Sequence, residues 1–526
     1  MTGRLVAEVR ELLAAAADLY GDDDAAETLR AYERRLDEPL RVAVAGMVKA
    51  GKSTLLNAIL GEEIAPTDAG ECTTVVTWYR YGATPRVTLF PLDGAPRSLP
   101  VRREDGRLLL SLEGTTPDRV RRIEVEWPVP SLRRLTLVDT PGIASLSGDV
   151  SARTTDFLTP EDAPAQADAV VYLMRHMHAS DINFLQSFRD TEASRSGTVN
   201  AIAVLSRADE VGAGRIDAMI SAGVVAARYR DDPTLRPLAL GVVPVAGLVA
   251  QSARTLRQEE FAALSAFAEL DRAARERMLI SADRFASPSA PVDIAPERRR
   301  ALLQRFGIFG IRLGVALVRG GTTDPTGLAH AMVRRSGLDA LLSLLDAQFQ
   351  TRAEHLKARS ALVAVEQLLR ERPRHGAEDV RAALERVRAG AHELRELGLL
   401  AQARSTGLPL RDRAAAAEAE VLVGGRGAGP RERLGLPADA PDEQVRAEAA
   451  KRSRQWRARA ESPLTDRAAA EVCRVVVRSC EGILAEVPAA ADQVPAVEQV
   501  PPEPASAVAE PAADAGREAH QVGQGG

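Results

Sequence analysis

Apolar positions follow a helical spacing at the start of the chain. The first run comprises Leu5, Val9, Leu12, Ala16 and Leu19, and the second comprises Ala25, Leu29, Tyr32 and Leu36. Steps of three and four residues place such side chains on one face of a helix. We therefore expect two amphipathic helices within residues 1–39.

The pattern changes over residues 40–250, where short runs of β-branched and aliphatic residues alternate with helical stretches. The expected strands are Val42–Ala45, Thr74–Tyr79, Val87–Phe90, Ile123–Trp127, Leu135–Val138, Ala169–Leu173, Ala201–Leu205 and Val242–Val245. Alternation of strands and helices is typical of an α/β fold. Residues 40–250 are therefore expected to form one α/β domain.

Only helical periodicity remains after residue 250. One apolar seam runs from Leu338 to Val363 and another from Val380 to Leu394. Together with the N-terminal pair, these helices are expected to form an extended antiparallel bundle, with residues 251–425 as its main part. A smaller helical unit is expected over residues 426–486.

Composition and charge narrow the class of protein. Residues 487–526 are rich in Pro, Ala and Glu, which predicts a disordered tail. The chain as a whole has the 45% hydrophobic and 27% charged residues of a folded protein, and its net charge of −5 argues against a dedicated nucleic-acid binder. Three scattered cysteines favour a reducing, cytoplasmic compartment. No signal segment and no transmembrane helix are expected.

Residues 46–53, Gly-Met-Val-Lys-Ala-Gly-Lys-Ser, match the phosphate-binding pattern G-x-x-x-x-G-K-[ST]. An apolar strand precedes them and a helical run follows, which is the context that the pattern requires. The loop amides and the helix N-terminus would face the phosphates, Lys52 would bridge the β- and γ-phosphates, and Ser53 would ligate Mg²⁺. The nucleotide-binding residues expected here are Gly46, Lys49, Ala50, Gly51, Lys52, Ser53 and Thr54. This motif alone leaves ATP and GTP open.

Asp139-Thr140-Pro141-Gly142 follows the next predicted central strand. Asp139 is expected to reach Mg²⁺ through water, and the Gly142 amide is expected to contact the γ-phosphate. A third element lies between the two motifs, where Thr73 and Thr74 follow a loop that begins at Pro66. One of these two threonines is expected to complete the Mg²⁺ shell.

Ser206-Arg207-Ala208-Asp209 ends a predicted strand at the place where GTPases carry N/T-K-x-D. An ionised carboxylate only accepts hydrogen bonds, so Asp209 suits the two donors of guanine and would meet an acceptor on adenine. GTP is therefore preferred over ATP, although Ser206 and Arg207 depart from the usual residues. The stretch Val242–Gly247 gives a weaker indication of a further base-contacting loop.

These motifs resemble those of the dynamin superfamily, most closely the bacterial dynamin-like proteins of actinobacteria and the shorter member of the mycobacterial isoniazid-inducible pair. The resemblance covers about residues 5–486 in layout, but its specific motifs lie in the nucleotide domain. It implies that Thr73 is the threonine that acts on Mg²⁺ and in catalysis. It also implies GTP hydrolysis after face-to-face pairing of two such domains, either in a homodimer or with a sister protein.

The resemblance further implies that Lys49 acts as a finger that neutralises charge between the β- and γ-phosphates; a solvent-facing lysine is the alternative. Helical stalks of such proteins carry the motion to a membrane. The apolar segment 306–318, flanked by arginines, is a possible contact with an anionic membrane surface. Its glycines would equally permit close packing of helices.

The leading hypothesis is a cytoplasmic dynamin-like GTPase that binds GTP or GDP with Mg²⁺ and contacts the inner face of the plasma membrane peripherally. One alternative is a Ras/Era-like regulatory switch. The other is an interaction scaffold that binds nucleotide with little turnover. The helical regions on both sides of the nucleotide domain favour the first hypothesis.

Overall fold

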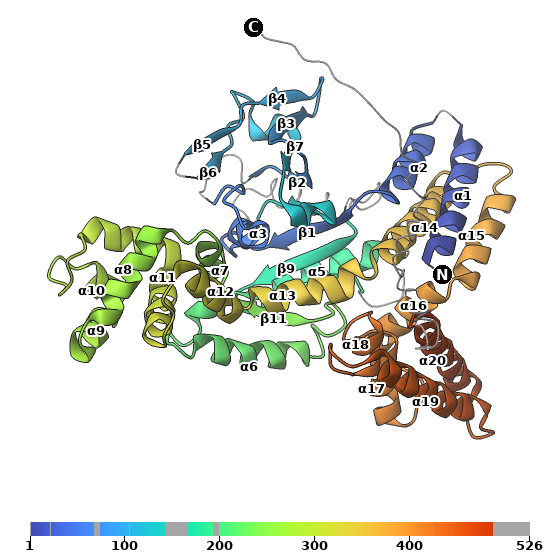
Figure 1. Ribbon diagram of the computed structural model, residues 1–526. Helices are drawn as coiled ribbons and strands as arrows, with labels where there is room; N and C mark the ends of the chain where they lie inside the picture. The colour runs from blue at the N-terminus through green and yellow to red at the C-terminus, as the bar shows by residue number, and fades with distance from the viewer. Residues whose placement is uncertain are drawn as a thin grey trace, which may run out of the picture.

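A central β-sheet lies between groups of helices in the computed structural model of the chain (Figure 1). The structure describes residues 2–21, 23–67, 74–104, 106–142, 167–192 and 199–487. Thr73, Cys72 and residues 488–526 of the predicted tail lie outside this part, so the expectations for them stay predictions. The expected α/β domain with helical regions from both flanks is confirmed.

The main sheet has nine strands in the order β11-β10-β9-β1-β8-β2-β7-β3-β4. Strands β11, β10, β9, β1 and β8 run parallel, and β2 pairs with β8 in the antiparallel sense. Strand bounds are β1 Leu40–Gly46, β2 Thr77–Tyr81, β3 Arg86–Pro91, β4 Arg97–Leu99, β7 Val120–Trp127, β8 Leu135–Asp139, β9 Ala169–Met174, β10 Ala201–Ser206 and β11 Val242–Val245. A separate hairpin pairs β5 Arg102–Glu104 with β6 Arg107–Leu109.

Helices cover both faces of the parallel strands, and the alternation of side chains along β1 decides which residue meets which helix. Val42 and Val44 pack in one cluster with α3 Lys52–Leu60 and α13 Leu338–Leu345. Ala43 and Ala45 pack in another with α5 Ala179–Glu192 and α6 Ala218–Arg230. A strand buried on both faces reads as a continuous apolar run, which is why the sequence predicts β1 clearly.

Helices from both ends of the chain form a bundle beside the sheet, as the sequence predicts (Figure 1). Its members are α1 Thr2–Tyr20, α2 Asp24–Arg35, α14 Ala353–Glu371 and α15 Glu378–Gly390. The apolar seam of α1, with Val9 and Ala16 fully buried, lies in this core. The hydroxyl of Tyr20 donates to the carbonyl oxygens of Leu368 and Arg372, which fixes α1 against α14.

The rest of the region predicted as the bundle, residues 251–425, does not join this core. A second group of helices packs with α7 Gly247–Arg254 on the opposite side of the sheet (Figure 1). It consists of α8 Gln258–Glu269, α9 Arg272–Met278, α10 Ala282–Ala286, α11 Pro296–Arg319 and α12 Pro325–Ser336. Helices that follow one another in the sequence therefore do not all pack together here. Helices α14 and α15 pack against the N-terminal helices and not against α8–α12.

The predicted membrane-contact segment 306–318 lies in α11, and its glycines lie against other helices of this second group. A Cβ atom at Gly310 would lie 3.1 Å from Val249 Cγ2, and one at Gly314 would lie 3.0 Å from Leu264 Cδ1. The glycines thus permit close packing on α7 and α8. Among the described helices, α11 has the length and composition to cross a membrane, although the sequence predicts no such helix. This is weak evidence for a span, and 44% of its apolar window is buried.

A third group of helices follows the bundle and includes the predicted unit 426–486. It begins earlier than predicted, because α16 and α17 pack with the later helices. Its members are α16 His392–Ser405, α17 Arg413–Leu422, α18 Pro430–Leu434, α19 Asp442–Glu461 and α20 Arg467–Glu486. Trp456 of α19 and Cys473 and Cys480 of α20 are buried in its core. Burial raises the pKa of the Cys480 thiol to about 12, so we expect this thiol to be unreactive at neutral pH.

Candidate functional site

Residues 46–53 form a loop that joins β1 to α3. Two of its residues require left-handed backbone angles that glycine supplies, with φ of 147° at Gly46 and 96° at Gly51. A Cβ atom at Gly46 would lie 2.4 Å from the carbonyl oxygen of Leu173. Lys49 also has a positive φ of 63°, which is uncommon for a residue with a side chain. The glycines of the G-x-x-x-x-G-K-[ST] pattern therefore stand at positions where the backbone of this loop requires glycine.

Lys52, Ser53 and Asp139 meet at the mouth of this loop. The ammonium of Lys52 donates to the carbonyl oxygen of Gly46 at 3.2 Å, and Ser53 Oγ donates to Asp139 Oδ2 at 2.8 Å. Burial lowers the pKa of Lys52, against the opposing effect of Asp139. For the acidic group the effect of burial has the opposite sign, and it raises the pKa of Asp139 to about 6. The loop thus places a lysine, a hydroxyl and a buried carboxyl group together, as the sequence predicts.

The Asp139–Gly142 segment lies directly against the loop. Thr140 donates through Oγ1 to the carbonyl oxygen of Val44 at 3.0 Å, which ties the segment to β1. A Cβ atom at Gly142 would lie 2.6 Å from Val48 Cγ2. Only glycine therefore brings the backbone this close to residues 46–53. Thr73 lies outside the described residues, so its expected place beside Ser53 is untested.

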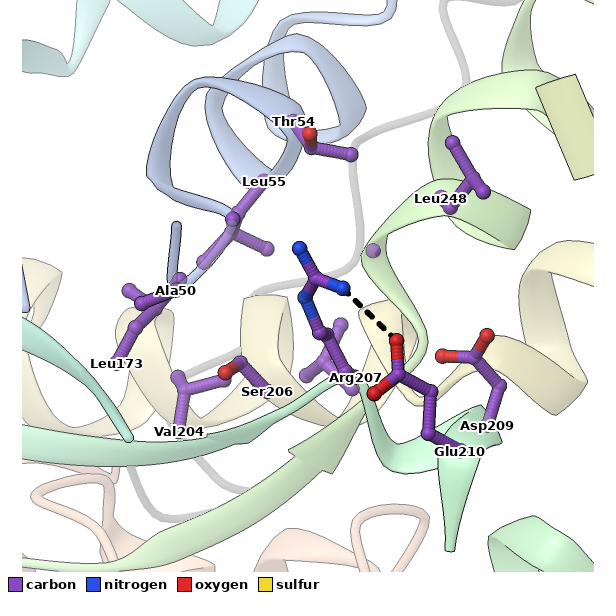
Figure 2. Close-up of a pocket in the computed structure, with 13 residues that line it drawn as sticks. Ala50, Thr54, Leu55, Leu173, Val204, Ser206, Arg207, Asp209, Glu210 and Leu248 are labelled. Carbon is purple, nitrogen blue, oxygen red and sulfur yellow. Dashed lines mark hydrogen bonds and ion pairs between the residues drawn. The ribbon is translucent and has the colours of Figure 1, made fainter. Parts of the chain in front are cut away.

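A cavity of about 160 Å³ lies next to the loop. Its lining residues are Ala50, Gly51, Thr54, Leu55, Leu173, Val204, Ser206, Arg207, Asp209, Glu210, Val245, Gly247 and Leu248. Figure 2 shows side chains from α3, from the end of β10 and from α7 around this one space. The three segments that the sequence singles out for phosphate and base thus meet in one cavity, including the weakly indicated Val242–Gly247 stretch.

Arg207 connects the Ser206–Asp209 segment to the loop of residues 46–53. It has a left-handed φ of 50° and donates through Nη1 to Glu210 at 2.9 Å and through Nη2 to the carbonyl oxygen of Lys49 at 3.2 Å. Burial raises the pKa of Asp209. Ser206 Oγ donates to the carbonyl oxygen of Met174 at 3.2 Å, so this serine serves β10 packing as well as lining the cavity.

Several cavity residues have no motif of their own and were missed by the sequence analysis. Leu173, Val204 and Leu248 supply apolar walls, and Glu210 orients Arg207. Ligands of open α/β sheets bind beyond the carboxyl ends of the strands. The residues at or just after the ends of β9, β10 and β11 could therefore have been selected by that rule.

The donor set at the phosphate loop fits a divalent cation. Asp139 Oδ1 is buried and has no hydrogen-bond partner among the described residues, while Oδ2 already accepts from Ser53. A hydroxyl beside a carboxylate is the oxygen chemistry that Mg²⁺ takes in phosphate sites. Ser53 and Asp139 are the described residues that would hold the ion, which would supply positive charge to the phosphates.

Comparison with known proteins gives a consistent result. The dynamin family model matches residues 42–207. The chain is 43% identical over 456 residues to the isoniazid-induced protein IniC of Mycobacterium tuberculosis, covering 86% of this chain and 92% of that protein. It is 36% identical over 115 residues to the bacterial dynamin-like protein of Nostoc punctiforme, covering 20% and 16%. A solved structure of a bacterial dynamin pair aligns with this chain at 13% identity and a TM-score of 0.30, covering 74% of this chain and 79% of that chain.

Proposed function

Because the chain belongs to the dynamin family, we propose that it binds and hydrolyses GTP with Mg²⁺ and couples pairing of its nucleotide domains to membrane contact. The observation that carries the proposal is the single cavity shared by the phosphate loop, the Ser206–Asp209 motif and the start of α7. A P-loop by itself would suit ATP as well. The carboxylate of Asp209 at the other end of the cavity favours guanine.

In this proposal each residue has a defined part. The amides of residues 46–53 and Lys52 hold the phosphates, and Ser53, Asp139 and Thr73 hold Mg²⁺, which neutralises phosphate charge. The Gly142 amide contacts the γ-phosphate, and Lys49 stabilises the charge that develops during hydrolysis. Thr54, Ala50 and the Ser206–Asp209 motif form the walls of the cavity around the sugar and the base.

Membrane contact is the second half of the proposal. We propose a cytoplasmic enzyme bound peripherally to the inner face of the plasma membrane, with a homodimer or a dimer with a sister dynamin-like protein as its active form. The match over 92% of IniC, against 22% of the related isoniazid-induced protein IniA, supports equivalence to the shorter member of that pair. The packed α11 lends no support to the 306–318 segment as the contact.

GTP turnover measured with and without vesicles of anionic lipid, across protein concentration, tests the proposal. Turnover per molecule that rises with both concentration and vesicles supports it. Slow turnover that is independent of both indicates a regulatory switch, and tight binding without turnover indicates a scaffold. A Lys52→Ala variant controls for contaminating phosphatases, since it removes the phosphate contact.

A further inference from the structure

Helix α11 lies against the loop that follows the base-recognition motif. Its residue Arg312 donates through Nη1 to the carbonyl oxygen of Gly214. The same guanidinium donates through Nε to the carbonyl oxygen of Leu279 at 3.0 Å and through Nη2 to that of Ile280 at 3.0 Å. One side chain therefore joins the loop after Asp209 to the turn between α9 and α10.

Gly214 lies close to both α11 and the backbone of Asp209. A Cβ atom at this position would lie 3.3 Å from Ile308 Cγ2 and 3.6 Å from the carbonyl oxygen of Asp209. The first distance is tight enough that Ile308 would have to shift by a few tenths of an ångström, and the second is an ordinary van der Waals contact. A shift of α11 toward or away from Gly214 is therefore transmitted to the residue that faces the base.

The loop is not held in place by its own conformational preferences. Gly212, Ala213 and Gly214 all have left-handed φ, at 68°, 60° and 66°. Glycine adopts this region freely and alanine avoids it. The conformational preferences of these three residues therefore contribute little to the stability of the loop. Within the loop, the amide of Ala213 donates to the carbonyl oxygen of Glu210 at 3.1 Å. Arg312 adds an anchor from outside the loop, and a guanidinium with several donors in a fixed fork is well suited to hold carbonyl oxygens from separate segments.

We propose that Arg312 is a positioning residue for base selection, which acts by holding Gly214 against Asp209. The inference rests on the proposed binding of guanine nucleotides and deepens it. Hydrogen bonds weaken steeply when distance and angle depart from their narrow range. Loss of the anchor therefore weakens the contact of Asp209 with guanine while leaving the phosphate loop unchanged.

The test measures dissociation constants for GDP and ADP, with Mg²⁺, on the full chain. In the Arg312→Met variant we expect the ratio of ADP to GDP dissociation constants to fall about tenfold or more, while the value for ADP stays within about twofold. A general structural defect would weaken both nucleotides together. An unchanged ratio in folded Arg312→Met would overturn the proposal, as would equal weakening of both nucleotides.

Arg299 supplies the matched control. It lies on the same helix and also donates to main-chain carbonyl oxygens, those of Phe285 at 2.7 Å and Ser287 at 2.9 Å, but both of these partners lie within the α8–α12 group. Arg299→Met should leave the ratio unchanged, and a fall equal to that of Arg312→Met would count against a specific role.

A second variant keeps the proposal testable if Arg312→Met does not fold. Gly214→Ala adds a Cβ atom between Ile308 and Asp209 and should lower the same ratio; an unchanged ratio there would contradict the proposal. The wild-type chain separates this result from the proposed function. If wild type binds neither nucleotide, the proposed function fails, whereas wild-type selectivity that survives in the folded variants overturns only the role of Arg312.

Discussion

Arg35 of α2 and Asp168 at the start of β9 form an ion pair 2.6 Å long, and their side chains are only 8% and 2% exposed. Asp168 also accepts a hydrogen bond from the backbone amide of Arg41 at 2.9 Å, at the beginning of β1. The pair thus joins the helical bundle to the end of the sheet at which β1 begins. From there β1 runs to the loop of residues 46–53. Its low exposure makes it sensitive to loss of either partner.

We expect Asp168→Ala to lower the free energy of unfolding by about 3–5 kcal/mol, because it leaves a buried guanidinium without its carboxylate. The double variant Arg35→Met/Asp168→Leu should lose less, since no buried charge is left uncompensated. Urea unfolding followed by circular dichroism measures both. A double variant as unstable as the single one would show that the pair is not energetically coupled in this way.

Lys49→Ala should lower kcat for GTP by about a hundredfold with modest change in the affinity for GDP, if Lys49 stabilises charge during hydrolysis. Among the described residues its side chain has no hydrogen bond or ion pair that would give it a structural role. Single-turnover hydrolysis and GDP binding separate the two effects. Lys451→Ala, on the exposed face of α19, is the matched control because only two other lysines remain in the chain. Unchanged kcat would remove Lys49 from the mechanism.

Asp209→Asn should change the base preference from guanine to xanthine. The asparagine amide keeps one acceptor but presents a donor where the carboxylate accepted, and xanthine carries an oxygen in place of the guanine amino group. We expect GTP affinity to fall about a hundredfold and XTP affinity to rise. Competition binding with the two nucleotides measures the exchange. Asp209→Ala should gain no XTP affinity, and equal behaviour of the two variants would argue that Asp209 does not read the base.

Glu396 of α16 predicts a pH dependence of stability. Burial raises its pKa, but Arg433 and hydrogen bonds from His392 and Ser479 outweigh this and lower the pKa to about 2, from the usual 4.5. Since the folded-state pKa is the lower one, the contribution of Glu396 to stability is complete above about pH 4.5. It is then lost progressively as the pH falls toward 2.

Unfolding free energies measured in urea from pH 7 to pH 3 test this expectation. Glu396→Gln should be less stable at pH 7, by up to about 3 kcal/mol, and its stability should fall less between pH 5 and pH 3 than that of the wild type. A variant with the wild-type slope would show that other carboxyl groups dominate the acid response.

The sequence predicts the parallel core of the sheet well, because strands buried on both faces read as continuous apolar runs. Predicted Val42–Ala45 lies within β1, and predicted Ala201–Leu205 lies within β10. The strand predicted from Thr74 begins only at Thr77. Strands β4, β5 and β6 were missed because each has three residues and most of their side chains are exposed, so they carry no apolar alternation.

Those parts of the site that lie within local sequence motifs were predictable. Residues 46–53 specify a loop with their own glycines, and Asp139 ends a strand whose place beside β1 follows from the fold class. The contact between Arg312 and Gly214 was not predictable, because 98 residues separate them and neither belongs to a motif. The 306–318 segment shows the same limit: apolar composition predicts burial but does not say whether lipid or protein buries it.

The packing on α7 determines how far the chain must extend for the nucleotide domain to be stable alone. Truncation after residue 250 would uncover Val249, which is fully buried in the α8–α12 group. It would also remove Ser336, whose carbonyl oxygen accepts from Ala246 at 2.8 Å, and Leu341, which covers the sheet. Such a fragment would expose an apolar patch to the solvent, and we expect it to aggregate. A fragment that keeps the nucleotide domain folded must therefore reach at least the end of α13.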